Sequence, residues 1–205
     1  KKIEEKNYLY TEDYPDFLIA PHGGKLIDRF NPNQSIQFPK NILDIDEETL
    51  MAMEQIATGS FSPLEGFMKE GDFHSVLDEM RLSSGVVWPL PIFLAVDELK
   101  RKNLNEGEDV LLDYNGITHG ILHLEQIYTV DKKSAAQKIF GTTDIAHPGV
   151  RKFLDSGDYF LGGKITLLKK KNSAHKVHEL TPRQARKIFS ERGWSKILGF
   201  HTRNV

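Results

Sequence analysis

Apolar residues recur at helical spacing in four short segments of the first 155 residues. The expected helices cover residues 46–59, 71–80, 131–140 and 148–154. The first is the most clearly marked, because Asp46 is a good capping residue and two acidic residues follow it, which the positive end of a helix favours. Glycines mark the ends of three of these segments, as is common where helices stop.

Strands are predicted by apolar runs and by a turn between two of them. The expected strands cover residues 86–96, 108–113, 118–130 and 159–168. Asn115-Gly116 lies between the second and the third strand and is a strong hairpin signal. Pro89 and Pro91 interrupt the first strand, which places its first half at a sheet edge. The centre of the chain is therefore expected to be β-rich and barrel-like.

The N-terminal quarter of the chain is expected to be mostly loop. The first 45 residues are rich in Pro, Asn and Gly, so we expect loops and short strands there. Residues 21–24, Pro-His-Gly-Gly, are interpreted as a turn, because they lack the strand-to-helix context of a phosphate-binding loop. Residues 60–68 form a loop with more apolar residues than solvent exposure favours, so we expect this loop to pack against the body of the protein.

The pattern changes from β to α/β after the basic run at residues 169–171. Residues 172–175 have the composition of a linker, so we place a domain boundary after residue 173. The next segment, Thr-Pro-Arg-Gln at residues 181–184, has the signature of a helix start, with a capping residue, proline in the first turn and a capping-box glutamine. This helix is expected to end at Gly193.

Four polar residues follow that helix and a short apolar run. Residues 196–200 are expected to form the first strand of a parallel sheet, so that residues 201–204 emerge at its carboxyl end, where open α/β sheets bind ligands. These four, His-Thr-Arg-Asn, supply an imidazole, a hydroxyl, a guanidinium and an amide, all suited to holding an oxyanion. The alternative is that they are only the polar start of a loop.

The remaining histidines are interpreted as structural. His119 and His123 can share one strand face, but a metal site needs further ligands, and their separation along the strand argues against direct chelation. His175 and His178 flank the expected domain boundary and are interpreted as linker residues. We therefore expect no metal ligands among the residues of this chain.

The composition is that of a globular protein. The chain has 205 residues, of which 39% are hydrophobic, and 27 basic against 29 acidic side chains, which excludes disordered and fibrous classes. Its longest apolar stretch falls well short of the roughly 20 residues of a membrane helix. The absence of cysteine excludes disulfides and thiolate chemistry and makes the cytoplasm the default compartment. Because the sequence starts at Lys1 without an apolar targeting segment, we expect a shortened start and no signal peptide.

Charge is distributed unevenly along the chain. Residues 164–205 carry eleven basic and two acidic side chains, a net charge of +9, and the remainder carries −11. Such asymmetry is found where proteins bind nucleic acid or anionic ligands, but a basic run is more often a solvated strand end or loop, and the latter interpretation is preferred here. The interleaved basic and aromatic residues of a nucleic-acid surface are not evident.

Five segments of the chain resemble the N-terminal portion of the sulfate adenylyltransferase family, also called ATP sulfurylases. They are PHGGKL at residues 21–26, TGSFSPLEGFM at 58–68, WPLPI at 88–92, HPGV at 147–150 and LTPRQ at 180–184. They occur in the order and spacing of that family over nearly the whole chain. The resemblance implies an α+β protein, with a PUA-like β-barrel domain at residues 1–173 followed by the truncated start, residues 174–205, of an α/β Rossmann-like nucleotidyltransferase catalytic domain.

The resemblance also implies a reaction and the residues that perform it. The family signature Gln-Thr-Arg-Asn corresponds to His201, Thr202, Arg203 and Asn204, with His201 in place of the usual glutamine. Arg203 would hold sulfate with help from His201, and Thr202 and Asn204 would orient the ATP phosphates. Thr202, Arg203 and Asn204 would thus be the catalytic residues of a reaction that converts ATP and sulfate to adenosine 5′-phosphosulfate and pyrophosphate.

Further expectations follow from the same resemblance. The parent protein would use Mg²⁺ with ATP and would be a homo-oligomer without membrane or nucleic-acid partners. Since the chain ends at Val205, before the other nucleotide-binding motifs of the family, we expect it to be inactive alone. Two alternatives remain: a PUA-like module that binds RNA, and a module that serves mainly in subunit assembly.

Overall fold

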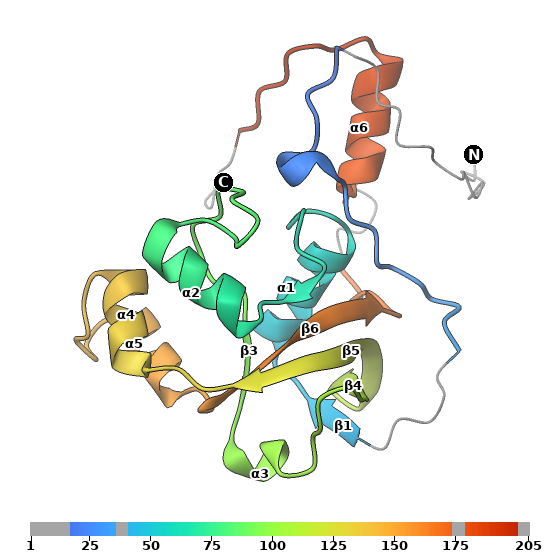
Figure 1. Ribbon diagram of the computed structural model, residues 1–205. Coiled ribbons are helices and arrows are strands. Elements are labelled where there is room, and N and C mark those ends of the chain that lie inside the picture. The colour runs from blue at the N-terminus through green and yellow to red at the C-terminus, as the bar shows by residue number, and fades with distance from the viewer. Residues whose placement is uncertain (1–16, 36–40, 174–178, 201–205) are drawn as a thin grey trace.

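A computed structural model of the chain describes residues 17–35, 41–173 and 179–200 (Figure 1). The described elements are a 3-10 turn η1 (His22–Gly24), β1 (Asn41–Asp44), α1 (Glu47–Ala57), β2 (Gly66–Phe67), α2 (Glu70–Glu79), β3 (Leu94–Val96), α3 (Glu98–Arg101), β4 (Asp109–Tyr114), β5 (Ile117–Tyr128), α4 (Lys132–Phe140), α5 (Pro148–Asp155), β6 (Tyr159–Leu167) and α6 (Pro182–Glu191). None of the helices in these ranges has the length and apolarity needed to span a bilayer. Residues 41–167 thus form a mixed α and β structure around one sheet.

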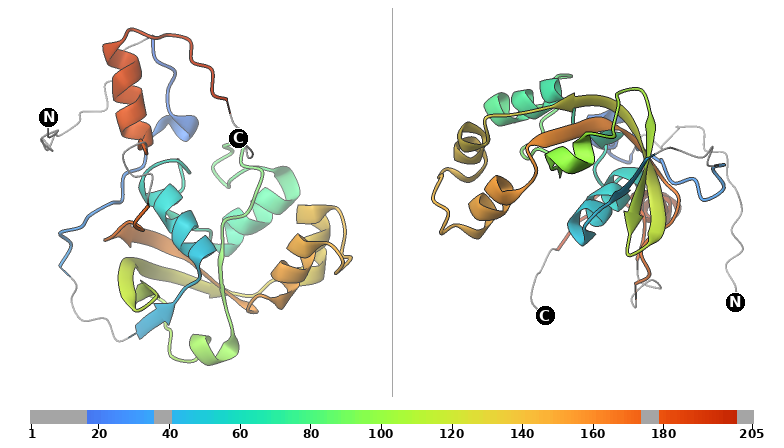
Figure 2. Two further views of the ribbon diagram at one scale, coloured as in Figure 1. Left: turned by 180° about the vertical axis from the view of Figure 1, so that it is seen from behind. Right: turned by 90° about the horizontal axis from the view of Figure 1, so that it is seen from below.

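The sheet has six strands and is mostly antiparallel. Its path is β1-β4-β5-β6-β2, with β3 also paired to β6, and only β1 and β4 run parallel. The predicted β4–β5 hairpin is confirmed: Asn115 and Gly116 both have positive φ, at 52° and 73°, as a two-residue hairpin turn requires. The long strands β5 and β6 curve strongly, as the right-hand view of Figure 2 shows.

Two apolar clusters pack against this sheet. The first lies under α1, where Leu50, Met53 and Ile56 follow helical spacing and are fully buried against strand residues such as Leu122 and Ile165. The capping expected of Asp46 is also confirmed, because its side chain accepts a hydrogen bond from the Thr49 amide. The apolar spacing and the N-terminal cap of α1 are therefore predicted correctly from the sequence.

The second cluster is aromatic and joins α2, α4 and α5 to the other end of the sheet. Phe160 of β6 is fully buried, and its ring lies 5.0–6.3 Å from those of Phe73, Phe93, Tyr128 and Phe153. Edge-on and tilted rings at such distances interact favourably beyond the burial of their surface. This packing fixes the helices that cover the edge of the sheet.

The strand expected over residues 86–96 is wrong for its first part. Only β3 (Leu94–Val96) pairs with the sheet, and Val87 and Leu90 are 50% and 55% exposed. Pro89 and Pro91 lack the N–H groups that a ladder needs and restrict the residues before them. The apolar run therefore crosses the surface as irregular chain before it enters the sheet.

The strand expected over residues 196–200 is also wrong. The chain from Gly193 to Phe200 is irregular, and Leu198 and Phe200 are 93% and 89% exposed. A strand needs a neighbour for its backbone hydrogen bonds, and no described strand lies alongside these residues. The boundary expected after residue 173 adjoins residues outside the described ranges and stays a prediction.

α6 forms as predicted but stands apart from the sheet (Figures 1 and 2). The capping box is complete: the Thr181 hydroxyl accepts from the Gln184 amide, and the Gln184 side chain accepts from the Thr181 amide at 2.8 Å. The helix lies beside the N-terminal segment that contains η1, far from it in the sequence. This arrangement brings a C-terminal helix and an N-terminal segment side by side.

Candidate functional site

The predicted oxyanion site lies outside the described residues. His201, Thr202, Arg203 and Asn204 follow directly on Phe200, the last described residue, and their assigned roles stay predictions. The structure describes α6 and residues 192–200, which precede these four residues in the chain.

Three of the segments that carry the family resemblance meet at η1. The Nε2 atom of His22 lies 2.8 Å from the carbonyl oxygen of Val87, and its ring lies 6.2 Å from that of Trp88. Trp88 in turn contacts Phe61 edge-on at 5.9 Å. We call this meeting of residues 21–24, 61–63 and 87–88 the junction.

Gly23 lies at the closest approach within the junction. Its φ of 71° is in the left-handed region, and a Cβ atom at this position would lie 2.6 Å from the ring of Pro63. Only glycine meets both conditions without strain. The expected turn at residues 21–24 is confirmed, and its glycine allows close packing on the loop before β2. The loop expected over residues 60–68 is wrong for Gly66 and Phe67, which form β2 because they pair with β6.

The segment around the turn, residues 17–31, is anchored to the sheet, and we call it the strap. The amide of Arg29 donates to the carbonyl at the end of α1, at 2.8 Å, and its carbonyl accepts from Leu167 at the end of β6, at 2.9 Å. The amide of Ile27 donates to the Ser62 hydroxyl at 3.0 Å. The strap is thus fixed by hydrogen bonds to the end of α1, to β6 and to the loop that contains Ser62, with Leu18 and Ile27 buried.

The first half of α6, which begins in the resembling segment at residues 180–184, contacts the strap through two arginines. The guanidinium of Arg183 lies 3.2 Å from the carboxylate of Asp28. The guanidinium of Arg186 donates to the carbonyl oxygen of Ile19. Residues three apart share one helix face, so both arginines point to the same side of α6. These contacts were missed in the sequence, because neither residue carries a local signal for a partner more than 150 positions away.

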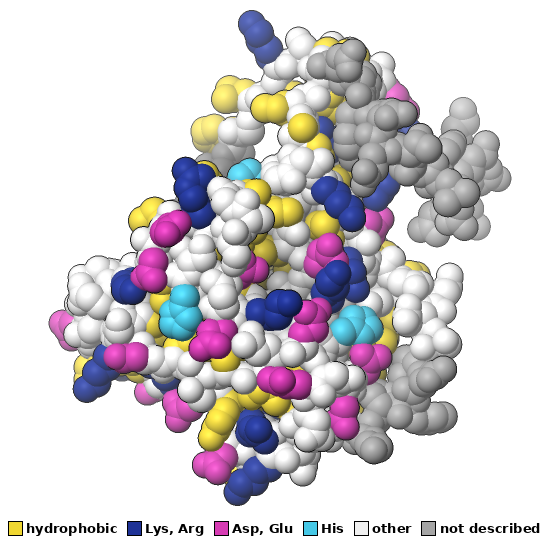
Figure 3. All heavy atoms as spheres, viewed as in Figure 1, with side chains coloured by type: hydrophobic (Ala, Val, Ile, Leu, Met, Phe, Trp, Pro, Cys, Tyr) yellow, Lys and Arg dark blue, Asp and Glu magenta, His cyan; other side chains and the backbone are white. Residues whose placement is uncertain are grey.

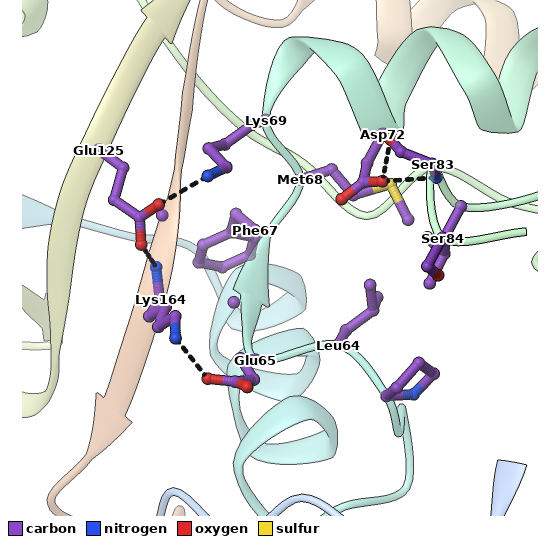
Figure 4. Close-up of a pocket in the computed structure, with 14 residues that line it drawn as sticks. Leu64, Glu65, Phe67, Met68, Lys69, Asp72, Ser83, Ser84, Glu125 and Lys164 are labelled. Carbon is purple, nitrogen blue, oxygen red and sulfur yellow. Dashed lines mark hydrogen bonds and ion pairs between the residues drawn. The ribbon is translucent and has the colours of Figure 1, made fainter. Parts of the chain in front are cut away.

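A pocket of about 450 Å³ opens between β2, β6 and the start of α2 (Figure 4). Its floor is apolar, and its wall carries ion pairs, of which Lys69 with Glu125 measures 2.8 Å and Lys164 with Glu65 measures 2.9 Å. Arg29 of the strap adds a second contact to Glu65 at 3.2 Å. Figure 3 shows basic and acidic side chains interspersed over this face of the molecule.

These ion pairs shift the pKa values of their members. The hydrogen bond from Lys164 lowers the pKa of Glu65, and that from Lys69 lowers the pKa of Glu125, against the opposing effect of partial burial. The same bond to Glu125 raises the pKa of Lys69. Since each of these carboxylates already has a cationic partner, the network is suited to joining β2, β5 and β6 rather than to binding a further ion.

The histidines of β5 make protein contacts. His123 lies 2.6 Å from a carboxylate oxygen of Asp109 through Nδ1 and 2.9 Å from the Thr166 hydroxyl through Nε2. His119 is buried, and its Nδ1 atom lies 2.9 Å from the carbonyl oxygen of Lys169. Across the described ranges, no group of three or more His, Asp or Glu side chains is placed to hold a metal ion.

Comparison with known proteins identifies a domain family and a set of similar sequences. A profile of the PUA-like domain family matches residues 19–170. Sulfate adenylyltransferases from Chloroflexus aurantiacus (strain J-10-fl) and Thermococcus onnurineus (strain NA1) are each 42% identical, over 190 and 196 residues. These matches cover 91% and 92% of this chain but 49% and 50% of the relatives, so the chain spans about half the length of the curated relatives it matches.

A solved structure also shares the fold. The hexameric APS kinase from Thiobacillus denitrificans superposes with a TM-score of 0.64 over 86% of this chain and 32% of that protein, at 24% identity. At this identity the likeness concerns the fold alone.

Proposed function

This chain belongs to the PUA-like domain family, and from that premise we propose that it is the N-terminal portion of a sulfate adenylyltransferase. The proposal rests chiefly on the 39–42% identity, over nine tenths of the chain, to proteins of that name. The same identity favours this function over the alternatives of an RNA-binding or subunit-assembly module.

The proposed reaction joins two anions. A sulfate oxygen attacks the α-phosphorus of ATP, the new bond gives adenosine 5′-phosphosulfate, and the bond to the bridging oxygen breaks to release pyrophosphate. The enzyme must hold both anions in line and stabilise the charge that moves to the leaving group. Mg²⁺ is proposed to enter with ATP as part of the substrate and to offset the phosphate charge.

Residues 201–204 are the proposed contribution of this chain to that chemistry. Arg203 would pair two sulfate oxygens through its planar fork, and Thr202 and Asn204 would orient the ATP phosphates. His201 would add a ring nitrogen near the sulfate in place of an amide. The amphipathic α6 and the apolar run after it would deliver these residues to the site.

The proposed domain organisation follows from where α6 lies. We assign residues 1–173 to a PUA-like β-barrel domain and residues 174–205 to the start of a Rossmann-like nucleotidyltransferase domain. In support, Leu198 and Phe200 are 93% and 89% exposed in the described part of the chain, as expected of residues that the rest of a catalytic domain would cover. The relatives, about twice as long as this chain, have length enough for such a domain.

Other parts of the proposal concern the parent protein. Its partners would be ATP and sulfate, its location would be the cytoplasm, and it would assemble as a homo-oligomer. The isolated 205-residue chain would be inactive, because most of the nucleotide site is proposed to lie beyond it.

Pyrophosphate-dependent formation of ATP from adenosine 5′-phosphosulfate tests this function. We expect the longer protein to form ATP and the 205-residue chain to form none above background. ATP formation by the isolated chain would refute the incomplete site. A longer protein that is inactive, but binds RNA in a salt-sensitive manner, would refute the proposal and support the RNA-binding alternative.

A further inference from the structure

A second pocket, which shares no lining residue with the one in Figure 4, has no role in the proposed function. It has a volume of about 430 Å³ and lies between the start of α1, the end of α4, α5 and the irregular run that leads into β3. We propose that this pocket binds a small organic cation, with an apolar body against its aromatic wall and a protonated amine at the carboxylates of Asp46 and Glu48. Such a site does not depend on the proposed function.

The pocket is enclosed by four segments that lie apart in the sequence. Pro89 and Pro91 keep the chain irregular until β3 begins, and residues 90–93 pass between α1 on one side and α4 with α5 on the other, as the left-hand view of Figure 2 shows. Gly149, in the first turn of α5, lets the ring of Phe140 come close, because a Cβ atom there would lie 2.7 Å from that ring. The volume of this hollow is within the range of small-molecule sites, about 300–1,000 Å³.

The inner wall of the pocket is apolar and largely aromatic. Phe93, Phe140 and Phe153 line it, with ring centroids 5.4 Å apart for Phe93 and Phe153 and 6.3 Å apart for Phe140 and Phe153. Ile92 of the run and Ala52 of α1 line the same space. This wall favours the apolar body of a ligand, and aromatic rings also attract a nearby organic cation more than they attract an anion.

The charged residues of the lining give the pocket a net negative charge. They are Asp46 and Glu48 at the start of α1 and Lys152 of α5, which together carry −1. The partial positive charge at the start of a helix, about +0.5, leaves this sum negative. Lys152 pairs with Glu48, and the side chains of the two residues are 59% and 73% exposed, so this ion pair joins α5 to α1 at the rim of the pocket.

Asp46 is suited to receive a protonated amine. Its carboxylate accepts a hydrogen bond from the Thr49 amide at 2.8 Å. Partial burial tends to raise the pKa of Asp46, but the hydrogen bonds from Thr49 and the charge of Lys152 outweigh it, so the pKa lies below its ordinary value. Asp46 is therefore ionised at neutral pH, and a carboxylate has lone pairs for more donors than Thr49 supplies.

Ligand-observed NMR titration of the longer protein tests this site with three probes of similar shape. Phenylethylammonium carries a positive charge, phenylethanol is neutral, and phenylpropionate carries a negative charge. We expect saturable binding of phenylethylammonium at millimolar concentration. Phenylethanol should bind about twofold to fivefold more weakly, because it lacks the charge that pairs with the rim, and phenylpropionate should bind more weakly still.

Two substitutions at the rim should change the affinity for phenylethylammonium in opposite directions. Glu48→Gln removes a negative charge and should weaken binding by about twofold to fivefold, whereas Lys152→Gln removes the positive charge and should strengthen binding by a similar factor. The double variant restores the net charge of −1 and should bind like the wild type. Lys133→Gln, at an exposed lysine of α4 that does not line the pocket, is the matched control and should have no effect.

A substitution in the wall tests the location of the site. Ala52→Leu should prevent saturable binding in the same concentration range, because it adds volume inside the pocket while leucine is also a good helix former. Cooperative unfolding in urea would show that this variant is folded.

Several results of these titrations would overturn the proposal. They are absence of saturable phenylethylammonium binding to the wild type, equal or tighter binding of phenylpropionate, changes of the same sign in Glu48→Gln and Lys152→Gln, and wild-type affinity in folded Ala52→Leu. The titrations need no turnover. A longer protein that forms no ATP would therefore refute the proposed function, while the probes still decide whether the pocket binds a cation.

Discussion

At the scale of single residues, the junction depends on the absence of a side chain at Gly23. Its backbone is left-handed, and the Pro63 ring occupies the space that a Cβ atom would need. Gly24 also has a positive φ, of 83°, but has no atom within 4 Å of an added Cβ. Substitutions at Gly23 and Gly24 can therefore be compared, because both add backbone strain but only the one at Gly23 adds a steric clash.

We expect Gly23→Ala to destabilise the protein more than Gly24→Ala. A left-handed non-glycine residue costs about 1–2 kcal/mol at either position. The contact with Pro63 adds about 1–3 kcal/mol at residue 23 alone. Urea unfolding of the two variants measures the difference in free energy of unfolding, and equal losses would contradict the close packing of η1 on the loop at residues 60–68.

At the scale of elements, the ion pairs around β2, β5 and β6 make stability depend on pH. The pKa values of Glu65 and Glu125 are lowered in the folded state, so these groups bind protons more weakly there than in the unfolded chain. Their contribution is fully present above their ordinary pKa of 4.5 and is lost as the pH falls through the folded values.

We expect Glu65→Gln to reduce the loss of stability between about pH 6 and pH 3. The effect should be less than about 1 kcal/mol for each ion pair, because the partners are partly exposed. Denaturant unfolding across this pH range measures it, with Glu79→Gln as a control at an exposed glutamate outside the network. A slope in Glu65→Gln as steep as that of the wild type would show that the pairs contribute nothing.

Elements with local signals were predictable from the sequence. The cap of α1 at Asp46, the left-handed Gly141 that ends α4, the Asn115-Gly116 turn and the capping box of α6 all involve residues within five positions of one another. The same holds for the apolar periods of α1 and α2. Such signals act through nearby backbone groups, so they need no knowledge of the fold.

Elements that depend on distant partners were not predictable. The run at residues 86–93 is apolar enough for a strand, but its prolines and its packing on the strap keep it irregular. The run at residues 196–200 is apolar as well, and without an adjacent described strand it stays irregular and exposed. In both cases hydrophobicity indicated burial, and only the tertiary neighbours determine whether a strand forms.

At the scale of the whole molecule, the uneven charge is partly neutralised within the fold. Lys164 pairs with Glu65, Lys171 with Glu47, and Arg183 with Asp28, each joining the basic C-terminal stretch to the acidic remainder. Part of the net charge of +9 on residues 164–205 is therefore neutralised by ion pairs within the protein and does not form a free basic surface. This pairing supports the preferred interpretation of the basic runs over a nucleic-acid surface.

The candidate site was predictable only in part. The resembling segments near residues 22, 61, 88 and 183 were each recognised, and the turn and the helix start among them are confirmed. Their meeting at the strap was not foreseen, since Asp28 and Arg183 are joined only by folding. The roles of residues 201–204 stay predictions that chemistry must test.

The central claim is that residues of this chain take part in sulfate activation, and Arg203 tests it most directly. Sulfate-dependent release of pyrophosphate from ATP would be measured for the longer wild-type protein, Arg203→Gln and Lys196→Gln. We predict that Arg203→Gln lowers kcat/KM for sulfate by about 100-fold or more, because glutamine supplies neither the charge nor the two-pronged donor, while Lys196→Gln stays near wild type. Wild-type kinetics in Arg203→Gln would contradict the account.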